Sequence, residues 1–145
     1  MKHVWSVMCM RSLIDQESNN VSLIDCLEQL NIQINKNEES LKDKVFPVAF
    51  DFVSLFLDEN DTKERKMEFI LEVIDPSNKK ISEFPGEIIM KKGIKRYRNR
   101  LKIQGLKITD SGKYLFKLKV KDFSGEKYKE LAEIPLEVNI SYKLM

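Results

Sequence analysis

Apolar residues recur at every second position in segment after segment of this chain. The clearest cases are residues 45–58, with Phe46, Val48, Phe50 and Phe52, and residues 65–75, with Met67, Phe69, Leu71 and Val73. This period is typical of a β-strand, in which successive side chains point to opposite faces of a sheet. Because no long stretch after residue 35 has a convincing helical period, the sequence predicts an all-β protein.

Turn-forming residues divide the chain into about eight or nine predicted strands. The strands cover residues 3–14, 21–34, 45–58, 65–75, 80–84, 86–91, 98–106, 113–122 and 127–142. A change of phase near Val53 and Ser54 indicates a β-bulge. Helical structure is possible in two segments. Residues 22–30 fit either a strand or a helix, and the polar loop 35–44 has room for one helical turn.

Length and composition favour one compact domain. A chain of 145 residues is the size of an ordinary domain, and its 42% hydrophobic residues can supply a core. Frequent turns, no internal repeat and no linker predict a single antiparallel β-sandwich over residues 1–145. No segment has the roughly 18 consecutive apolar residues of a membrane span. No signal-peptide cleavage site follows the first apolar run either, so we expect a soluble cytoplasmic protein without a membrane partner.

A tyrosine-corner motif precedes one of the predicted strands. Leu106, Ile108, Asp110, Gly112 and Tyr114 follow the spacing L-x-I-x-D-x-G-x-Y, which resembles a signature of immunoglobulin-like domains. The resemblance implies an immunoglobulin-like sandwich in which the Tyr114 hydroxyl bonds to upstream backbone and pins the crossover between two sheets. Asp110 would cap backbone amides in the preceding turn, and Gly112 would tolerate a positive φ.

Phe116 stands where antibody-type domains have a disulfide cysteine, two residues after the corner tyrosine. The sequence therefore predicts an aromatic side chain in the core in place of an inter-sheet disulfide. This departure agrees with a reducing compartment. The motif indicates how the chain folds, but it does not indicate a function, because immunoglobulin-like sandwiches serve many unrelated roles.

A longer resemblance covers the first predicted hairpin. Residues 9–23 follow the pattern C-x-R-S-x-I-D-x-x-S-N-N-x-S-L. This pattern is similar to that of a small bacterial family of unknown function, and the Asp75-Pro76 turn is similar as well. The resemblance implies a β-sandwich and brings no known activity with it.

The residue inventory contains no recognisable catalytic, cofactor or metal site. His3 is the only histidine, and a catalytic triad or a zinc site would need it beside Cys, Asp or Glu from elsewhere in the fold. The sequence also has no glycine-rich phosphate loop and no nucleophile elbow. We therefore predict a protein that is not an enzyme and needs no cofactor, with His3 exposed or partly buried near the terminus.

Cys9 and Cys26 are predicted to face each other across a hairpin. If residues 15–20 form its loop, Ile14 pairs with Val21, and the same register pairs Cys9 with Cys26. One hypothesis is a redox-sensitive cross-strand pair. The other is two small buried hydrophobic side chains, which is how free cysteines usually behave.

A basic segment is the strongest functional feature of the sequence. Residues 90–108 hold eight of the 25 lysines and arginines and no acidic residue. On an extended strand, the three arginines 96, 98 and 100 share one face, and the intervening tyrosine lies on the other. The candidate binding residues are Lys91, Lys92, Lys95, Arg96, Tyr97, Arg98, Arg100 and Lys102.

Three interpretations of this segment remain open. Arginine side chains on one face could bind the carboxylates of an acidic protein, or the phosphates of a nucleic acid with Tyr97 stacked on a base. The third interpretation is a solvated hairpin that balances acidic strands nearby. We predict a non-catalytic protein-interaction or structural module whose partner is another protein or a second copy of this chain. Binding of a nucleic acid or another polyanion through residues 91–102 is the alternative.

Overall fold

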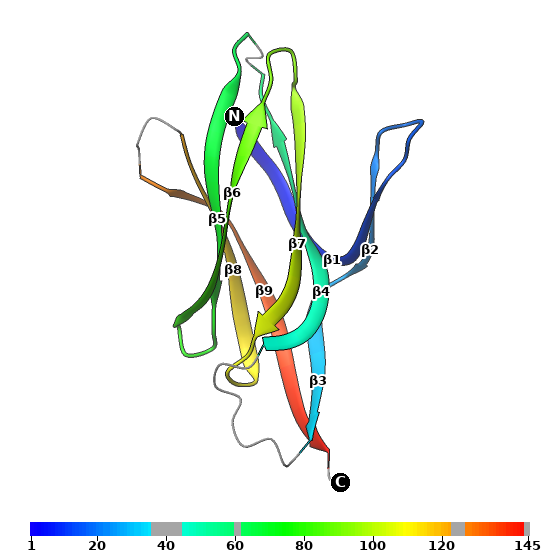
Figure 1. Ribbon diagram of the computed structural model, residues 1–145, viewed down its shortest axis with the longest axis vertical. Coiled ribbons are helices and arrows are strands. Elements are labelled where there is room, and N and C mark those ends of the chain that lie inside the picture. Colours follow the sequence, from blue (N-terminus) through cyan, green and yellow to red (C-terminus); the bar gives the residue numbers. More distant parts are fainter. Residues whose placement is uncertain (36–44, 60–61, 123–126, 144–145) are drawn as a thin grey trace.

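The computed structural model describes residues 1–35, 45–59, 62–122 and 127–143 (Figure 1). These residues form nine strands and no helix, so none of them provides a helix that could span a membrane. The strands are β1 (Lys2–Ile14), β2 (Val21–Cys26), β3 (Gln29–Asn35), β4 (Val45–Leu57), β5 (Arg65–Ile74), β6 (Lys80–Met90), β7 (Arg96–Lys107), β8 (Gly112–Asp122) and β9 (Lys129–Lys143). The helical turn was predicted within residues 35–44, of which 36–44 lie outside the described residues.

The strands pack as two sheets, so the predicted β-sandwich is confirmed. Sheet 1 has the strand order β2–β1–β4–β7, and sheet 2 has the order β3–β9–β8–β5–β6. All neighbouring strands are antiparallel except β3 and β9, and this parallel pair departs from the purely antiparallel prediction. The strands β6 and β7 lie at the edges of their sheets and run side by side, joined by the turn at residues 91–95 (Figure 1).

The parallel pair arises where the chain changes sheets. The Leu27 amide donates to the Met8 carbonyl in sheet 1 at 2.8 Å, and the Glu28 carbonyl accepts from the Glu137 amide in sheet 2 at 3.1 Å. Two residues therefore carry the chain from β2 directly into β3. The helical alternative for residues 22–30 is wrong, because both halves of this segment are held as strands by partners distant in sequence.

Side chains at alternate strand positions fill the space between the sheets. The predicted inner face of residues 65–75 is confirmed, since Met67, Phe69, Leu71 and Val73 are all buried. Phe116 is fully buried and packs edge to face against Phe50 from the opposite sheet, with ring centroids 6.0 Å apart. The aromatic ring thus occupies the core, as predicted from its place two residues after Tyr114.

The bulge predicted near Val53 and Ser54 is wrong. The pairing of β4 with β7 is continuous from Ala49 to Leu57, and the irregularity lies between Phe46 and Ala49. Val53 lies on the outer face of sheet 1, yet it has no exposed surface. Because this part of the outer face is also buried, apolar residues occur on both faces of β4. In the sequence, this loss of alternation resembles the change of phase that a bulge causes.

The strand break predicted at Pro85-Gly86 is also wrong, because β6 runs through both residues. An edge strand tolerates proline when the missing N–H would face away from the sheet. Gly86 is required by its neighbour: a Cβ atom there would lie 2.3 Å from the Phe69 ring. The aromatic ring therefore packs over the glycine and keeps the strand intact.

The β1–β2 hairpin has the predicted register. Ile14 lies opposite Val21, and Cys9 lies opposite Cys26. The loop is closed by Asp15, whose carboxylate accepts hydrogen bonds from the Glu17 and Ser18 amides at 2.8 and 2.9 Å. In Figure 1 this hairpin (blue) stands away from the body of the sandwich.

The Tyr114 side chain joins the β7–β8 connection to the core. Its hydroxyl accepts from the Thr109 amide at 2.9 Å and from the Asp110 amide at 3.2 Å, and it donates to the Asp110 carbonyl at 2.7 Å. This is the hydrogen-bond pattern of a tyrosine corner. Gly112 has φ +140°, and a Cβ atom there would lie 3.0 Å from Pro76. The corner is therefore packed directly on the β5–β6 turn.

Candidate protein-interaction surface

The basic segment forms the β6–β7 turn and the edge strand β7. Arg96, Arg98, Arg100 and Lys102 alternate along one face of β7, opposite Leu57, Leu55, Val53 and Asp51 of β4. Tyr97 lies on the other face, opposite Phe56. The structure therefore brings the predicted basic residues together, with the arginines on one face as expected from the period of two.

Arg98 binds the tip of the β1–β2 hairpin. Its two terminal nitrogens donate to the Asn19 carbonyl at 2.7 Å and to the Asn19 Oδ1 at 2.8 Å. Partial desolvation, followed by the nearby charges of Arg96 and Arg100, lowers the pKa of the Arg98 guanidinium from its ordinary value. The three arginines are close enough to repel one another. The two acceptors of Asn19 offset part of this repulsion at Arg98.

Arg100 binds strand β1 of the same hairpin. Its Nε donates to the Ser12 Oγ and its Nη2 to the Ser12 carbonyl, both at 2.9 Å. Ser12 in turn donates to the Asp51 carboxylate at 2.7 Å, and both side chains are buried. Two of the three predicted arginines are thus engaged with the hairpin, and sequence patterns alone could not show this.

Five of the exposed basic side chains on this surface are not bound to the hairpin, and we call these five the basic edge. They are Lys91, Lys92, Lys95, Arg96 and Lys102. None of the five forms an ion pair with another described residue. On the outer face of sheet 2, by contrast, Lys119 and Lys121 of β8 pair with Glu72 and Glu68 of β5 at 3.1 and 3.2 Å.

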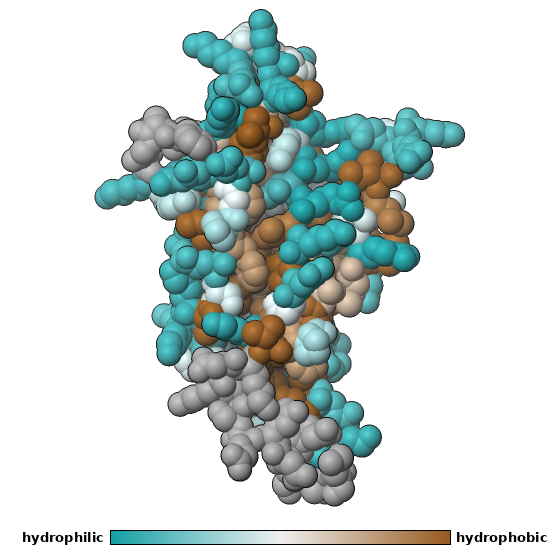
Figure 2. All heavy atoms as spheres, viewed as in Figure 1, coloured by the Kyte–Doolittle hydropathy of each residue, from teal (hydrophilic) through white to brown (hydrophobic). Residues whose placement is uncertain are grey.

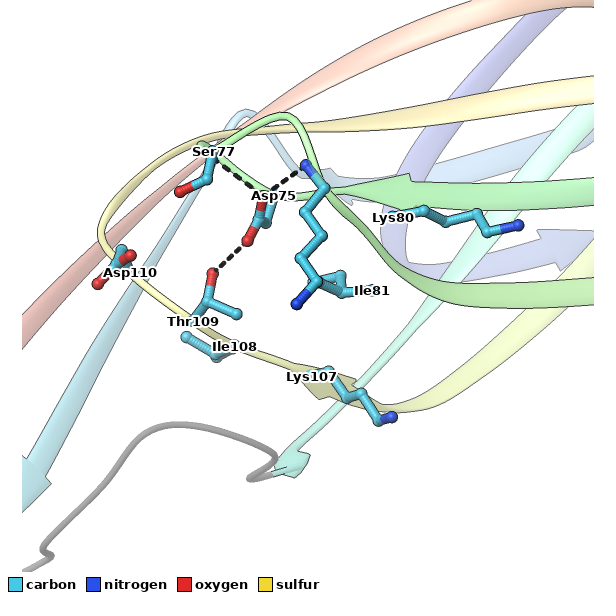
Figure 3. A pocket seen from close by; sticks show the side chains of 9 residues that line it. Asp75, Ser77, Lys80, Ile81, Lys107, Ile108, Thr109 and Asp110 are labelled. Carbon is cyan, nitrogen blue, oxygen red and sulfur yellow. Dashed lines mark hydrogen bonds between the residues drawn. The ribbon is translucent and has the colours of Figure 1, made fainter.

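A groove runs along the first half of β6 and reaches Lys107 at the end of β7, in the opening between the two edge strands. Its lower part is a pocket of about 490 Å³ between the β5–β6 turn and the β7–β8 connection (Figure 3). The buried Asp75 carboxylate accepts from the Ser77 and Lys79 amides at 3.0 and 2.8 Å and from the Thr109 hydroxyl at 3.0 Å. With three donors, this carboxylate serves to tie the turn to the corner. Figure 3 shows the Thr109 side chain pointing toward the Asp75 carboxylate at the edge of the pocket.

A chain of hydroxyl groups near the N-terminus was not predicted. His3 Nε2 lies 2.7 Å from the Ser6 Oγ, which lies 2.7 Å from the buried Ser54 Oγ. Residues three apart on a regular strand face opposite sides, but a register shift between His3 and Trp5 places His3 on the same face as Ser6. Burial lowers the pKa of the His3 imidazole. The contacts satisfy the Ser54 hydroxyl inside the sandwich.

The two cysteines are neighbours with different environments. Cys9 is fully buried and Cys26 is exposed, and both are free thiols. Burial, and then the nearby charges of Asp51 and Cys26, raise the pKa of the Cys9 thiol. Only one cysteine is therefore a buried hydrophobic side chain, and the redox-sensitive pair stays a prediction.

Native thiol labelling should distinguish the two cysteines. We expect iodoacetamide to modify Cys26 at least tenfold faster than Cys9, because the reagent can reach only the exposed thiol. Peptide mass spectrometry after timed labelling measures both rates. In urea the rates should converge, and Cys26→Ser should remove the fast phase. Equal rates in the native protein would contradict the burial of Cys9.

No protein-family model matches this chain, and no curated protein matches it either. The solved structures that are similar to this chain include the following two. One is a family 123 glycoside hydrolase from Clostridium perfringens, with 11% identity, a TM-score of 0.43, and coverage of 94% of this chain and 27% of that one. The other is the N-terminal domain of PorA, with 8% identity, a TM-score of 0.32, and coverage of 96% and 98%. This chain thus spans about a quarter of the hydrolase, and neither likeness is close enough to support a function.

Proposed function

We propose that this protein is a non-catalytic interaction module that binds an acidic segment of a protein partner through the basic edge. The observation that carries the proposal is the set of five exposed basic side chains on and beside an edge strand, with no acidic partner among the described residues. Unpaired charges of one sign favour an oppositely charged partner and speed its association.

The finer classification is part of the same proposal. We assign the sandwich to the immunoglobulin-like class and to the bacterial family that its N-terminal pattern resembles. The Tyr114 hydrogen bonds support the first assignment. The pattern residues Ser12 and Asn19, which accept hydrogen bonds from Arg100 and Arg98, support a shared hairpin structure for the second. Free cysteines and a buried Phe116 in place of a disulfide favour the cytoplasm.

A protein partner is favoured over a nucleic acid because of where Tyr97 lies. Its ring is on the inner face of β7, opposite Phe56, and is half-buried. A base held by its phosphate on the arginine face could not stack on a ring that points to the other side of the strand. Carboxylates need no such platform, since lysine and arginine bind them directly.

The basic edge should bind acidic peptides in a salt-dependent way. We expect a fluorescein-labelled peptide of about ten glutamates to bind more tightly than an oligothymidine of similar length at low salt. The triple variant Lys95→Gln, Arg96→Gln, Lys102→Gln should weaken peptide binding about tenfold, because three unpaired charges are lost. Fluorescence anisotropy at increasing salt measures both ligands. Arg98 and Arg100 are left unchanged because they hold the hairpin.

The matched control is Lys66→Gln, Lys129→Gln, Lys143→Gln, which removes the same charge from exposed positions away from β7. It should bind as the wild type does, and all three proteins should have similar melting curves. If the two triple variants lose the same amount of binding, the basic edge is not the site. If oligothymidine binds more tightly than the peptide, the proposal of a protein partner is overturned in favour of a nucleic acid.

A further inference from the structure

The strand β7 has one free backbone edge. It is the last strand of sheet 1 and pairs with β4 along residues 96–107. Among the described residues, no strand pairs with its other side. Every second residue of an edge strand directs its N–H and C=O away from the sheet, where they can pair with another chain. The edge is therefore a template for one more strand.

The two faces of that template differ in chemistry. On the outer face, Arg96 and Lys102 are exposed at either end of the row that includes Arg98 and Arg100. A strand added beside β7 would place every second side chain along this row. Acidic residues at alternate positions would therefore meet basic ones, as opposite charges do across neighbouring strands.

The inner face of the template is mostly apolar, with the polar Asn99 between Tyr97 and Leu101. Tyr97 and Leu101 of β7 and Ile81 and Phe84 of β6 are only partly buried and pack against the core from the opening between the sheets. Figure 2 shows hydrophobic side chains in this opening, bordered on both sides by hydrophilic ones. A groove of about 470 Å³ runs beside β6, lined by residues 80–84 and by Lys107 at the end of β7. Apolar side chains from an added strand would cover these residues.

We propose that β7 binds an extended segment of a partner protein as an added β-strand, and that this segment alternates acidic with apolar residues. The inference rests on the proposed function and specifies its binding mode. The backbone of the segment pairs with the free edge, its acidic side chains meet the basic row, and its apolar side chains enter the opening between β6 and β7. Residues 96–102 span roughly 20 Å, which about seven residues of partner can match.

A second copy of this chain is a poorer occupant of the same edge. Pairing of β7 with β7 of another copy would set two basic rows side by side, and like charges on neighbouring strands are unfavourable. The other edge strand of this side, β6, contains Pro85, which has no N–H to donate. Charge complementarity thus favours a different, acidic chain.

The test compares peptides, so that folding of the protein is not a variable. One labelled peptide of about nine residues alternates glutamate and valine, and a second has the same composition with its glutamates grouped. We expect the alternating peptide to bind wild-type protein at least tenfold more tightly by fluorescence anisotropy. Two further peptides carry N-methyl groups on alternate residues, so that each peptide has one of its two backbone edges blocked. The peptide blocked on the edge that faces β7 should lose about tenfold in affinity, and the other peptide should keep its affinity.

The outcomes separate the binding mode from the function. If the grouped peptide binds as tightly as the alternating one, or if neither N-methyl series weakens binding, strand addition is overturned, although an effect of the triple variant would still support an acidic partner. If the triple variant binds the alternating peptide as the wild type does, both proposals fail. A protein dimer that the alternating peptide does not dissociate in sedimentation experiments would assign the edge to a second copy and overturn the inference.

Discussion

Replacing Phe116 with alanine should lower the free energy of unfolding by about 3–5 kcal/mol. The Phe116 ring is fully buried between the sheets and stacks edge to face on Phe50. Its removal would leave a cavity that the surrounding strands cannot close, since both sheets are held by their own ladders. For a domain of this size the melting temperature should fall by roughly 10–16 °C.

The matched control for Phe116 is its neighbour Leu115. Leu115→Ala removes an apolar side chain that is only half-buried and points to the outer face of the same strand. We expect it to cost about 1 kcal/mol, because little buried surface is lost. Urea denaturation of both variants measures the difference. If the two substitutions cost the same, Phe116 does not fill the core in place of the disulfide.

Replacing Tyr114 with phenylalanine should cost about 2–3 kcal/mol although the ring stays in place. The hydroxyl is buried and takes part in three hydrogen bonds with the backbone of Thr109 and Asp110. Its loss leaves the part-buried backbone groups of the corner without this partner, and such groups are costly to leave unpaired. The urea midpoint should fall with little change in slope, because the surface exposed on unfolding is unaltered.

Tyr128→Phe is the control for the loss of a hydroxyl group. Tyr128 is exposed, and its hydroxyl lies 3.4 Å from a carboxylate oxygen of Glu68. We expect its replacement to change stability by less than about 0.5 kcal/mol, as most surface substitutions do. A Tyr114→Phe variant as stable as Tyr128→Phe would mean that the corner does not hold the two sheets together.

The strands and the first hairpin could be predicted because they depend on local patterns. Alternation identified the buried face of residues 65–75, and the hairpin loop set the register that places Cys9 opposite Cys26. The errors have a common cause. The bulge was misplaced because Val53 is buried on the outer face of its sheet. The break at Pro85-Gly86 was predicted because the sequence does not show that β6 is an edge strand or that the Phe69 ring packs on Gly86.

The candidate site was only partly predictable. The basic residues and their shared face follow from the sequence, since side chains two apart on a strand point the same way. That Arg98 and Arg100 bind the hairpin does not follow, because their partners Asn19 and Ser12 are 79 and 88 residues away. Only the tertiary structure therefore shows which basic residues bind the hairpin and which do not.

The sequence by itself determined that this chain forms strands, where most of them turn, and that one strand is basic on one face. These features depend on side-chain period and on turn residues, which act over a few positions. The tertiary structure alone decided the strand order, the parallel pairing of β3 with β9, and the position of β7 at an edge beside β6. These depend on contacts between distant segments, and the free edge of β7 exists only because no described strand completes sheet 1 on that side.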